Sequence, residues 1–286
     1  MSTNIEKDEV TGTETTGHDW DGIKELNNPV PRWWVYILYA TIIYSVVYWV
    51  LYPAWPTPDG GTKGVLGWTQ HGELSEAMQV ASAAQAGFLA RVAKTEVQDI
   101  SSDGDLLNFA LAGGRAAFGD NCAPCHGSGA QGFVGYPNLN DDHWLWGGTV
   151  EEIYTTIRYG IRAKHGETRE SEMPAFGRDE ILSKEEIDLV TDHVLSFTGK
   201  GQSTAAAAEL FADNCSACHG EKGEGDTDQG APRLNDALWL YGGERPMIVE
   251  TVSKSRAGVM PAWESRLDDA AIKSLAVYVH SLGGGQ

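Results

Sequence analysis

The sequence is poor in basic residues and in cysteine. Its 286 residues hold 21 Lys and Arg against 40 Asp and Glu, a net charge of −19 with His neutral. This excess of acid argues against a nucleic-acid-binding protein, whose binding surface is basic. Only four cysteines occur, too few for a disulfide scaffold in a chain of this length. The hydrophobic fraction of 42% nevertheless exceeds that of disordered chains, and the length allows two modest domains.

One long stretch lacks charge altogether. Residues 33–51 contain no charged side chain, and a helix of this length spans the ~30 Å hydrocarbon core of a bilayer at ~1.5 Å per residue. Tryptophan and tyrosine flank both ends, as they do at membrane interfaces. We predict one transmembrane helix over 33–52. A cleavable signal peptide or a buried core helix is disfavoured, because the leader is acidic and the stretch is full of bulky rings.

The few basic residues near this helix favour a cytoplasmic tail, residues 1–32, with the rest of the chain on the opposite side. Polar side chains also recur on one face of the helix, at Thr41, Tyr44, Ser45, Tyr48 and Tyr52. We interpret this polar stripe as a docking face for other membrane helices. The alternative is that its tyrosines extend towards the membrane interface. Residues 53–104 form the next segment, a linker that contains one helix at about 71–97.

The remainder of the chain contains an internal repeat. The motif Cys122-x-x-Cys125-His126 has its copy in Cys215-x-x-Cys218-His219, and these two motifs contain all four cysteines. Three further blocks recur in the same order, namely Pro137–Asp141 with Pro232–Asp236, Trp144–Gly148 with Trp239–Gly243, and Met173–Phe176 with Met260–Trp263. We therefore expect an all-α fold with two tandem copies of one small domain.

Each copy ends in an amphipathic helix with a recognisable start. Ser183 and Glu186 form a capping box before the first closing helix, and Asp268 or Asp269 caps the second. Glycine and short polar residues at 198–204 are typical of a flexible joint. The expected domains are 105–199 and 203–286.

The Cys-x-x-Cys-His motif is typical of covalent haem c attachment. Two thiols three residues apart lie on one side of a helical turn and form thioethers with the haem vinyl groups, while the adjacent imidazole binds iron. A structural zinc site needs four nitrogen or sulfur ligands, more than one motif supplies. A redox-active dithiol does not require the histidine. We therefore predict two haem c groups, attached through Cys122, Cys125, Cys215 and Cys218, with His126 and His219 as iron ligands.

Two methionines are candidates for the opposite side of each iron. Met173 and Met260 follow the motifs and are each succeeded by Pro, Ala and an aromatic residue. A thioether is a soft ligand that raises the potential relative to a second histidine. The alternatives are packing in the core for the methionines, and ligation by His143 or His165 instead. We expect each methionine to serve its own repeat, although a crossed arrangement would use the same eight residues.

The whole chain resembles one known family. The segment Gly17–Pro29, the helix entry Pro31–Trp34, the exit Tyr52–Pro56 and the two cytochrome c modules are together similar to the dihaem subunit of the cbb3-type cytochrome c oxidases. The resemblance implies one N-terminal transmembrane helix followed by two tandem class I cytochrome c domains. It also implies the haem attachment and axial roles of the eight residues above, with His126 and His219 proximal and Met173 and Met260 distal.

The resemblance further implies a bacterial inner-membrane complex with its haem domains in the periplasm. Its other members are a catalytic haem-copper subunit and a monohaem cytochrome subunit, and electrons come from a donor cytochrome c or a cytochrome bc complex. The chain itself relays electrons and carries no catalytic residues. Two other functions remain open at this point, a membrane-tethered dihaem shuttle outside any oxidase and a dihaem peroxidase, which needs one iron with an open position.

Overall fold

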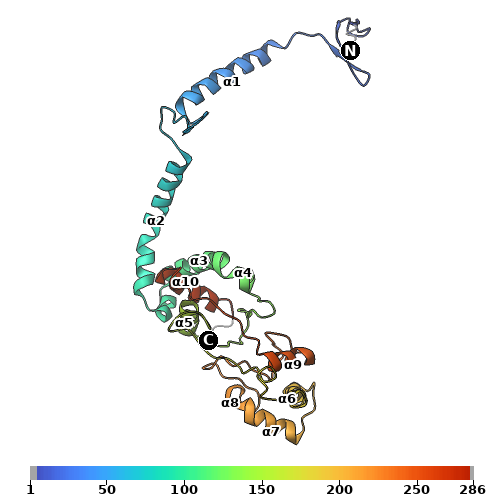
Figure 1. The fold of residues 1–286 in the computed structure, drawn as a ribbon. Helices are drawn as coiled ribbons and strands as arrows, with labels where there is room; N and C mark the ends of the chain where they lie inside the picture. The colour runs from blue at the N-terminus through green and yellow to red at the C-terminus, as the bar shows by residue number, and fades with distance from the viewer. Residues whose placement is uncertain (1–4, 284–286) are drawn as a thin grey trace. The chain divides into compact units, whose positions relative to one another are not determined.

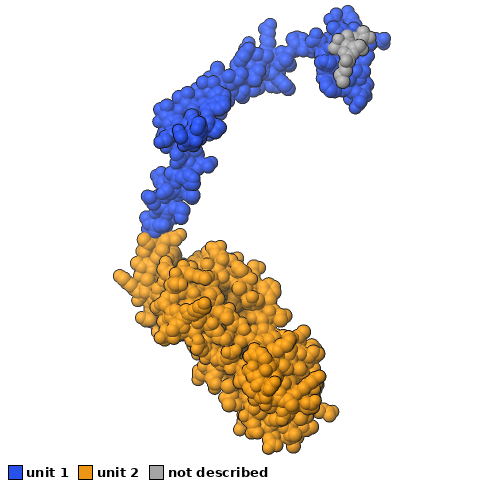
Figure 2. All heavy atoms as spheres, viewed as in Figure 1, with its two compact units in different colours: residues 1–83 blue, residues 84–286 orange. Residues whose placement is uncertain are grey.

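The computed structural model describes residues 5–283. The chain divides into two compact units, residues 1–83 and 84–286, each of which is described by itself (Figures 1 and 2). The division falls inside helix α2, Gln70–Lys94. Both Cys-x-x-Cys-His motifs belong to the second unit.

The first unit contains a β-hairpin that the sequence analysis did not predict. Strand β1 (Thr15–Trp20) pairs antiparallel with strand β2 (Ile23–Leu26). Asp21 and Gly22 between them have positive φ values of 55° and 91°, as in a two-residue type I′ turn. This Asp-Gly pair is the feature of the sequence that could have predicted the hairpin. A second, shorter pair is formed by β3 (Pro56–Thr57) and β4 (Gly60–Gly61).

Helix α1 (Arg32–Leu51) confirms the long apolar helix that was predicted over 33–52. Among residues 5–283 it is the one helix long and apolar enough to cross a membrane, and none of its residues is buried. Within the polar stripe, Thr41 Oγ1 donates to the Leu38 carbonyl and Ser45 Oγ to the Thr41 carbonyl, each at 2.8 Å. These two hydroxyls are therefore satisfied by their own helix, and the docking role of the stripe stays a prediction.

Helix α2 (Gln70–Lys94) confirms the helix expected at about 71–97, and a 3₁₀ helix, η1 (Val97–Ser102), follows it. In the second unit, α3 (Gly104–Asn121), α5 (Val150–Tyr159) and α10 (Asp269–His280) pack around one hydrophobic core. Figure 1 shows α10, in red, beside α3 and α5, in green. These helices, with η1 and the short α4 (Ala123–His126), form the first body.

The second body has its own core. It consists of α6 (Lys184–Ser196), α7 (Ala205–Asn214), α8 (Ser216–His219) and α9 (Arg245–Lys254). Its buried side chains include Phe176, Ile187, Val190, Phe211 and Ile248. Both closing helices begin where predicted: α6 at the Ser183–Glu186 capping box, and α10 at Asp268, whose side chain accepts the Ala271 N–H at 2.8 Å.

The two bodies are nested along the chain. The second body is built from residues 173–254, whereas the first combines segments from before and after it. Where the chain passes between them, Ile161 and Met260 pair antiparallel, and each donates its N–H to the other's carbonyl at 3.0 Å. Gly160, with φ of +72°, permits this approach, because a Cβ there would lie 2.4 Å from the Met260 carbonyl oxygen.

The expected domains, 105–199 and 203–286, follow the sequence repeats and stay a prediction, whereas the two packed bodies cross between the repeats. Helix α10 of the second repeat packs on α3 of the first, and α6 of the first packs on α7 of the second. The two closing helices have the same apolar spacing, so the pattern does not decide which core each helix completes.

The segment 198–204, expected as a flexible joint between domains, is the loop between α6 and α7 inside the second body. The rings of Phe197 and Phe211 on its two sides meet at 5.3 Å between centroids. His193 Nδ1 lies 2.7 Å from Ser203 Oγ across the same loop. A short connection favours a local helical hairpin of this kind, which leaves α10 to complete the first core.

The crossing of α3 and α10 requires glycine at one position. A Cβ at Gly114 would lie 2.1 Å from the Ser274 carbonyl oxygen and 2.6 Å from Tyr278 Cβ. We expect Gly114→Ala to push α10 off α3 and to lower the free energy of unfolding by ~1–3 kcal/mol, the usual cost of overpacking. Urea denaturation followed by circular dichroism measures this change.

Gly113→Ala is the matched control, because the nearest atom to a Cβ there, Ser274 Oγ, is 3.9 Å away. It should leave stability unchanged or raise it by up to ~1 kcal/mol through helix propensity. Equal losses for the two variants would contradict the close crossing.

Candidate functional site

Each Cys-x-x-Cys-His motif lies on a tight helical turn that follows a longer helix. Cys122 joins α3 to α4, and Cys215 joins α7 to α8. The His126 N–H donates to the Cys122 carbonyl at 2.9 Å, and the His219 N–H to the Cys215 carbonyl at 3.0 Å. The predicted placement of both motifs on helical turns is thereby confirmed.

A backbone carbonyl orients each imidazole. His126 Nδ1 donates to the Pro137 carbonyl at 3.0 Å, and His219 Nδ1 donates to the Pro232 carbonyl at 2.9 Å. Burial lowers the pKa of both histidines, which favours the neutral ring. A neutral ring protonated on Nδ1 directs the Nε2 lone pair at a metal. The sequence analysis found the repeated proline blocks but did not foresee this role for them.

The thiols do not have the character of a redox-active dithiol. Burial, helped by the neighbouring Cys125, raises the pKa of the Cys122 thiol to about 11. The Cys215 thiol beside Cys218 is raised to about 11 in the same way. Reactive dithiols instead have a depressed pKa, which favours the nucleophilic thiolate.

Met173 lies at the second motif. It lines one cavity with Cys215, Cys218 and His219, and its carbonyl accepts a hydrogen bond from Ser255 Oγ just beyond α9. Apolar side chains supply much of the remaining wall, among them Phe176, Val190, Val194, Phe211, Leu234, Trp239, Ile248 and Val252. A thioether from the first repeat and an imidazole from the second therefore line the same apolar space.

Met260 lies in the first body. Its side chain packs against the same core as Cys122, Ala123 and Trp144. The expectation that each methionine serves its own repeat is therefore not supported by the packing. The reason is the nesting of the two bodies. The chain carries Met173 of the first repeat into the body of the Cys215 motif, and Met260 of the second repeat into the body of the Cys122 motif.

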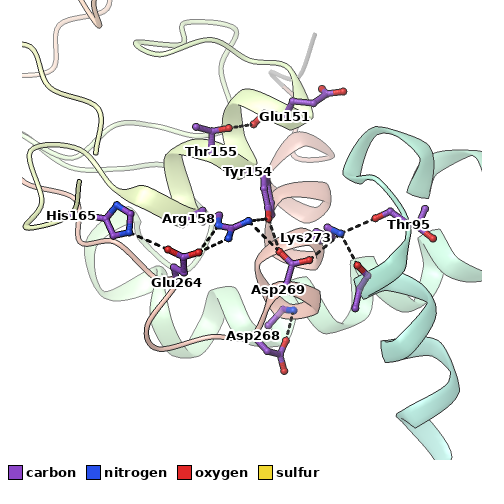
Figure 3. Close-up of polar contacts among 12 residues, drawn as sticks. Thr95, Glu151, Tyr154, Thr155, Arg158, His165, Glu264, Asp268, Asp269 and Lys273 are labelled. Carbon is purple, nitrogen blue, oxygen red and sulfur yellow. Dashed lines mark hydrogen bonds and ion pairs between the residues drawn. The ribbon is translucent and has the colours of Figure 1, made fainter. Parts of the chain in front are cut away.

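The two other histidines that were considered as ligands are engaged elsewhere. His165 Nδ1 accepts the Glu167 N–H at 3.0 Å, and its Nε2 lies 3.0 Å from Glu264 Oε2 (Figure 3). His143 Nδ1 lies 3.1 Å from Asp236 Oδ2, an ion pair between the repeats when the ring is protonated. Both ring nitrogens of His165 have partners, which argues against its use as an iron ligand.

The donor set of the second cavity fits haem c. Two thiols, an oriented imidazole and a thioether surround an apolar space, and three arginines, Arg162, Arg233 and Arg256, also line it. Guanidinium groups suit the carboxylates of a haem. Within residues 5–283, no group of three His, Cys, Asp or Glu side chains is arranged to hold a metal ion.

Comparison with known proteins identifies the family. The model of cytochrome c oxidase, cbb3-type, subunit III matches residues 109–194 and 202–279, and the N-terminal domain of cytochrome oxidase-cbb3, FixP, matches residues 12–59. The chain belongs to the cbb3-type cytochrome c oxidase subunit III family. The two matches to subunit III follow the sequence repeats, whereas the packed bodies cross between them.

Full-length relatives agree with this family. The CcoP subunit of a cbb3-type cytochrome c oxidase from Azospirillum sp. (strain B510) is 53% identical over 291 residues, covering 98% of each chain. The FixP subunit from Bradyrhizobium diazoefficiens is 48% identical over 290 residues, and the CcoP subunit from Cereibacter sphaeroides is also 48% identical over 290 residues. Both alignments cover 100% of each chain.

As a cbb3-type subunit III, the chain is a c-type cytochrome that relays electrons within an oxidase complex. The prediction of a non-catalytic electron-transfer subunit is confirmed, and the shuttle and peroxidase alternatives are not supported. Its cytochrome c domains imply haem c, and two domains indicate two haems. The long apolar helix α1 agrees with a membrane-associated subunit.

Proposed function

We propose that this subunit holds two covalently attached haem c groups with crossed distal ligands. Cys122, Cys125, His126 and Met260 hold the first, and Cys215, Cys218, His219 and Met173 hold the second. The observation that carries the proposal is the cavity that Met173 shares with His219. Haem c supplies a one-electron iron couple, whose potential a methionine ligand raises.

The residues of the chain act by positioning and by excluding water. The Pro137 and Pro232 carbonyls fix the imidazoles, and the apolar walls lower the local dielectric, which disfavours the more highly charged ferric state. Met173 and Met260 would supply the second iron ligand of each haem, which would leave no position for a substrate. Such sites pass electrons and do not activate peroxide.

The same proposal covers topology and partners. Residues 1–32 lie in the cytoplasm, α1 crosses the bacterial inner membrane, and both bodies lie in the periplasm. The subunit receives electrons from a donor cytochrome c or a cytochrome bc complex and passes them to a catalytic haem-copper subunit, beside a monohaem cytochrome subunit. The exposed apolar surface of α1 and the distribution of basic residues around it support this arrangement.

The haem count tests the attachment sites. We expect two covalently bound haems per full-length chain, because the chain has two complete motifs and no further cysteine. Replacing Cys215 and Cys218 by Ser should remove half of the haem, measured on denatured protein by haem stain and absorbance. The matched replacement of Cys122 and Cys125 should remove the other half. Complete loss or no loss in either variant would contradict two independent attachment sites.

The crossed ligands are tested by potentials in chains that retain one haem. With Cys215 and Cys218 replaced by Ser, Met260→His should lower the remaining midpoint potential by on the order of 0.1 V, part of the ~0.8 V range that axial ligands cover. Met173→His should leave that potential unchanged. Redox titration followed by absorbance gives both values.

The reciprocal background, with Cys122 and Cys125 replaced, should respond to Met173→His and not to Met260→His. If each substitution instead acts on the haem of its own repeat, the crossed arrangement is wrong. If no substitution shifts a potential, the methionines are not the distal ligands.

The acidic composition indicates how a soluble donor would be attracted. Residues 1–32 hold seven of the 40 acidic and three of the 21 basic residues, which leaves a net charge of about −15 on the rest of the chain. Such a surface steers a basic donor cytochrome c over the Debye length, which shrinks from ~30 Å at 0.01 M to ~8 Å at 0.15 M ionic strength.

Oxidase turnover with a basic cytochrome c should therefore fall steeply as salt increases. Turnover supported by an acidic cytochrome c of similar potential is the control, and it should not fall in the same way. A flat salt profile with the basic donor would indicate that electrons come from a donor already bound beside this subunit, or that the charge serves solubility alone.

A further inference from the structure

The chain after Met260 lies across the end of α5. The Trp263 N–H donates to the Ile157 carbonyl at 3.3 Å, and the Glu264 N–H donates to the Arg158 carbonyl at 3.2 Å. Together with the Met260–Ile161 pairing, these bonds attach residues 260–264, the Met260 loop, to the C-terminal end of a helix of the other repeat.

Glu264 adds the charged contacts of this loop. Its Oε1 accepts Arg158 Nε at 2.9 Å and also Arg158 Nη2, while its Oε2 accepts His165 Nε2 at 3.0 Å. Figure 3 shows the Arg158 and His165 side chains on either side of the Glu264 carboxylate. The contact with Arg158 holds the pKa of Glu264 below its usual value and raises that of Arg158. One carboxylate therefore joins the Met260 loop to α5 and to the loop that contains His165.

Arg158 extends this network into α10. Its Nη1 donates to Tyr154 Oη at 2.7 Å, and Tyr154 in turn donates to Asp269 at the start of α10. Asp269 also pairs with Lys273, a mostly buried side chain whose Nζ donates to the Ala93 and Thr95 carbonyls at 2.9 Å each. The Met260 loop is thus held between two helices by polar side chains.

The Met173 loop of the second body is held differently. The repeat offsets place Gly177 where the first body has Glu264, and Ser253 where it has Arg158. A Cβ on Gly177 would lie 3.1 Å from Ser253 Cβ, and the Arg178 N–H donates to the Ser253 carbonyl at 2.8 Å. Backbone contact and close packing therefore replace the ion pair at this site.

From this asymmetry we propose that Glu264, bound by Arg158 and His165, is a positioning residue that keeps Met260 in place at the first haem and has no counterpart at the second. The proposal rests on the proposed role of Met260 as a distal ligand. Loss of the carboxylate frees the loop from α5, so that the sulfur leaves the first iron in part of the molecules. The Met173 ligand is unaffected.

The test uses the full chain with both haems, purified without the catalytic subunit. The ferric charge-transfer band reports sulfur–iron bonds, and carbon monoxide binding to the reduced protein reports open axial positions. In a Met173→His background, only the first haem keeps a sulfur ligand. There, Glu264→Ala should remove much of the charge-transfer band and allow up to one carbon monoxide to bind per chain. In a Met260→His background the same substitution should change neither signal.

Arg245→Gln is the matched control. Arg245 forms a similarly exposed ion-pair contact with Asp188 and Asp192 across α9 and α6, away from both methionine loops. Glu264→Gln, which keeps an oxygen for Arg158 but loses the charge, should give an intermediate loss and serves also if Glu264→Ala does not accumulate. Haem content and circular dichroism verify that each variant is folded.

An unchanged band in Glu264→Ala on the Met173→His background overturns the positioning role, as does an equal loss in Arg245→Gln. A separate result would show that the proposed role of Met260 as an iron ligand is itself wrong. If the parent chain lacks the sulfur–iron band, or if Met260→His leaves the band at full intensity, Met260 is not a ligand.

Discussion

The antiparallel contact between Ile161 and Met260 joins the two segments by which the chain passes between its two cores. At this point the chain leaves the first body, enters the second and later returns, and the two strands pass close enough that Gly160 cannot carry a Cβ without a shift. Met260 itself lies in the first body, and the chain after Ile161 continues to Met173 in the second body. This contact therefore fixes where the chain passes between the two bodies, while Met260 and Met173 pack against separate cores.

The proximal and distal sides of each site differ in how they are built. On the proximal side, each motif is oriented by a proline carbonyl 11 or 13 residues further along the chain. On the proposed distal side, the first motif packs in the same body as Met260, which lies beyond the whole second body in the sequence. The contacts with the proline carbonyls are local and form readily. The contact with Met260 requires closure of a long loop, whose entropic cost grows slowly with its length. The contact with the proline carbonyl gives each motif a part that does not depend on this closure.

The sequence predicts local features well and the long-range packing poorly. Helices α1 and α2, the two motif turns and the caps at Ser183 and Asp268 follow from short-range spacing, because hydrophobic period and capping chemistry act within one or two turns. The hairpin at Asp21 lacks a hydrophobic alternation on either side and was missed. The nesting could not be read from the pattern, because α6 and α10 offer equivalent apolar faces to either core. What distinguishes the partner helices is close packing at particular residues, such as the contact of Gly114 in α3, which has no side chain, with Ser274 in α10.

The nested order of the two bodies also determines when each can be completed during biosynthesis. Chains emerge with the N-terminus first, so the Cys122 motif leaves the ribosome before the Cys215 motif. The second body needs only residues 173–254, whereas the first waits for α10, which ends at His280 near the C-terminus. The body that contains the motif translated first is therefore the last to be completed. The cysteines of that motif lie in an incomplete body until the last helix arrives, and a chain truncated by a few turns would leave the first body incomplete while it retained every residue of the second.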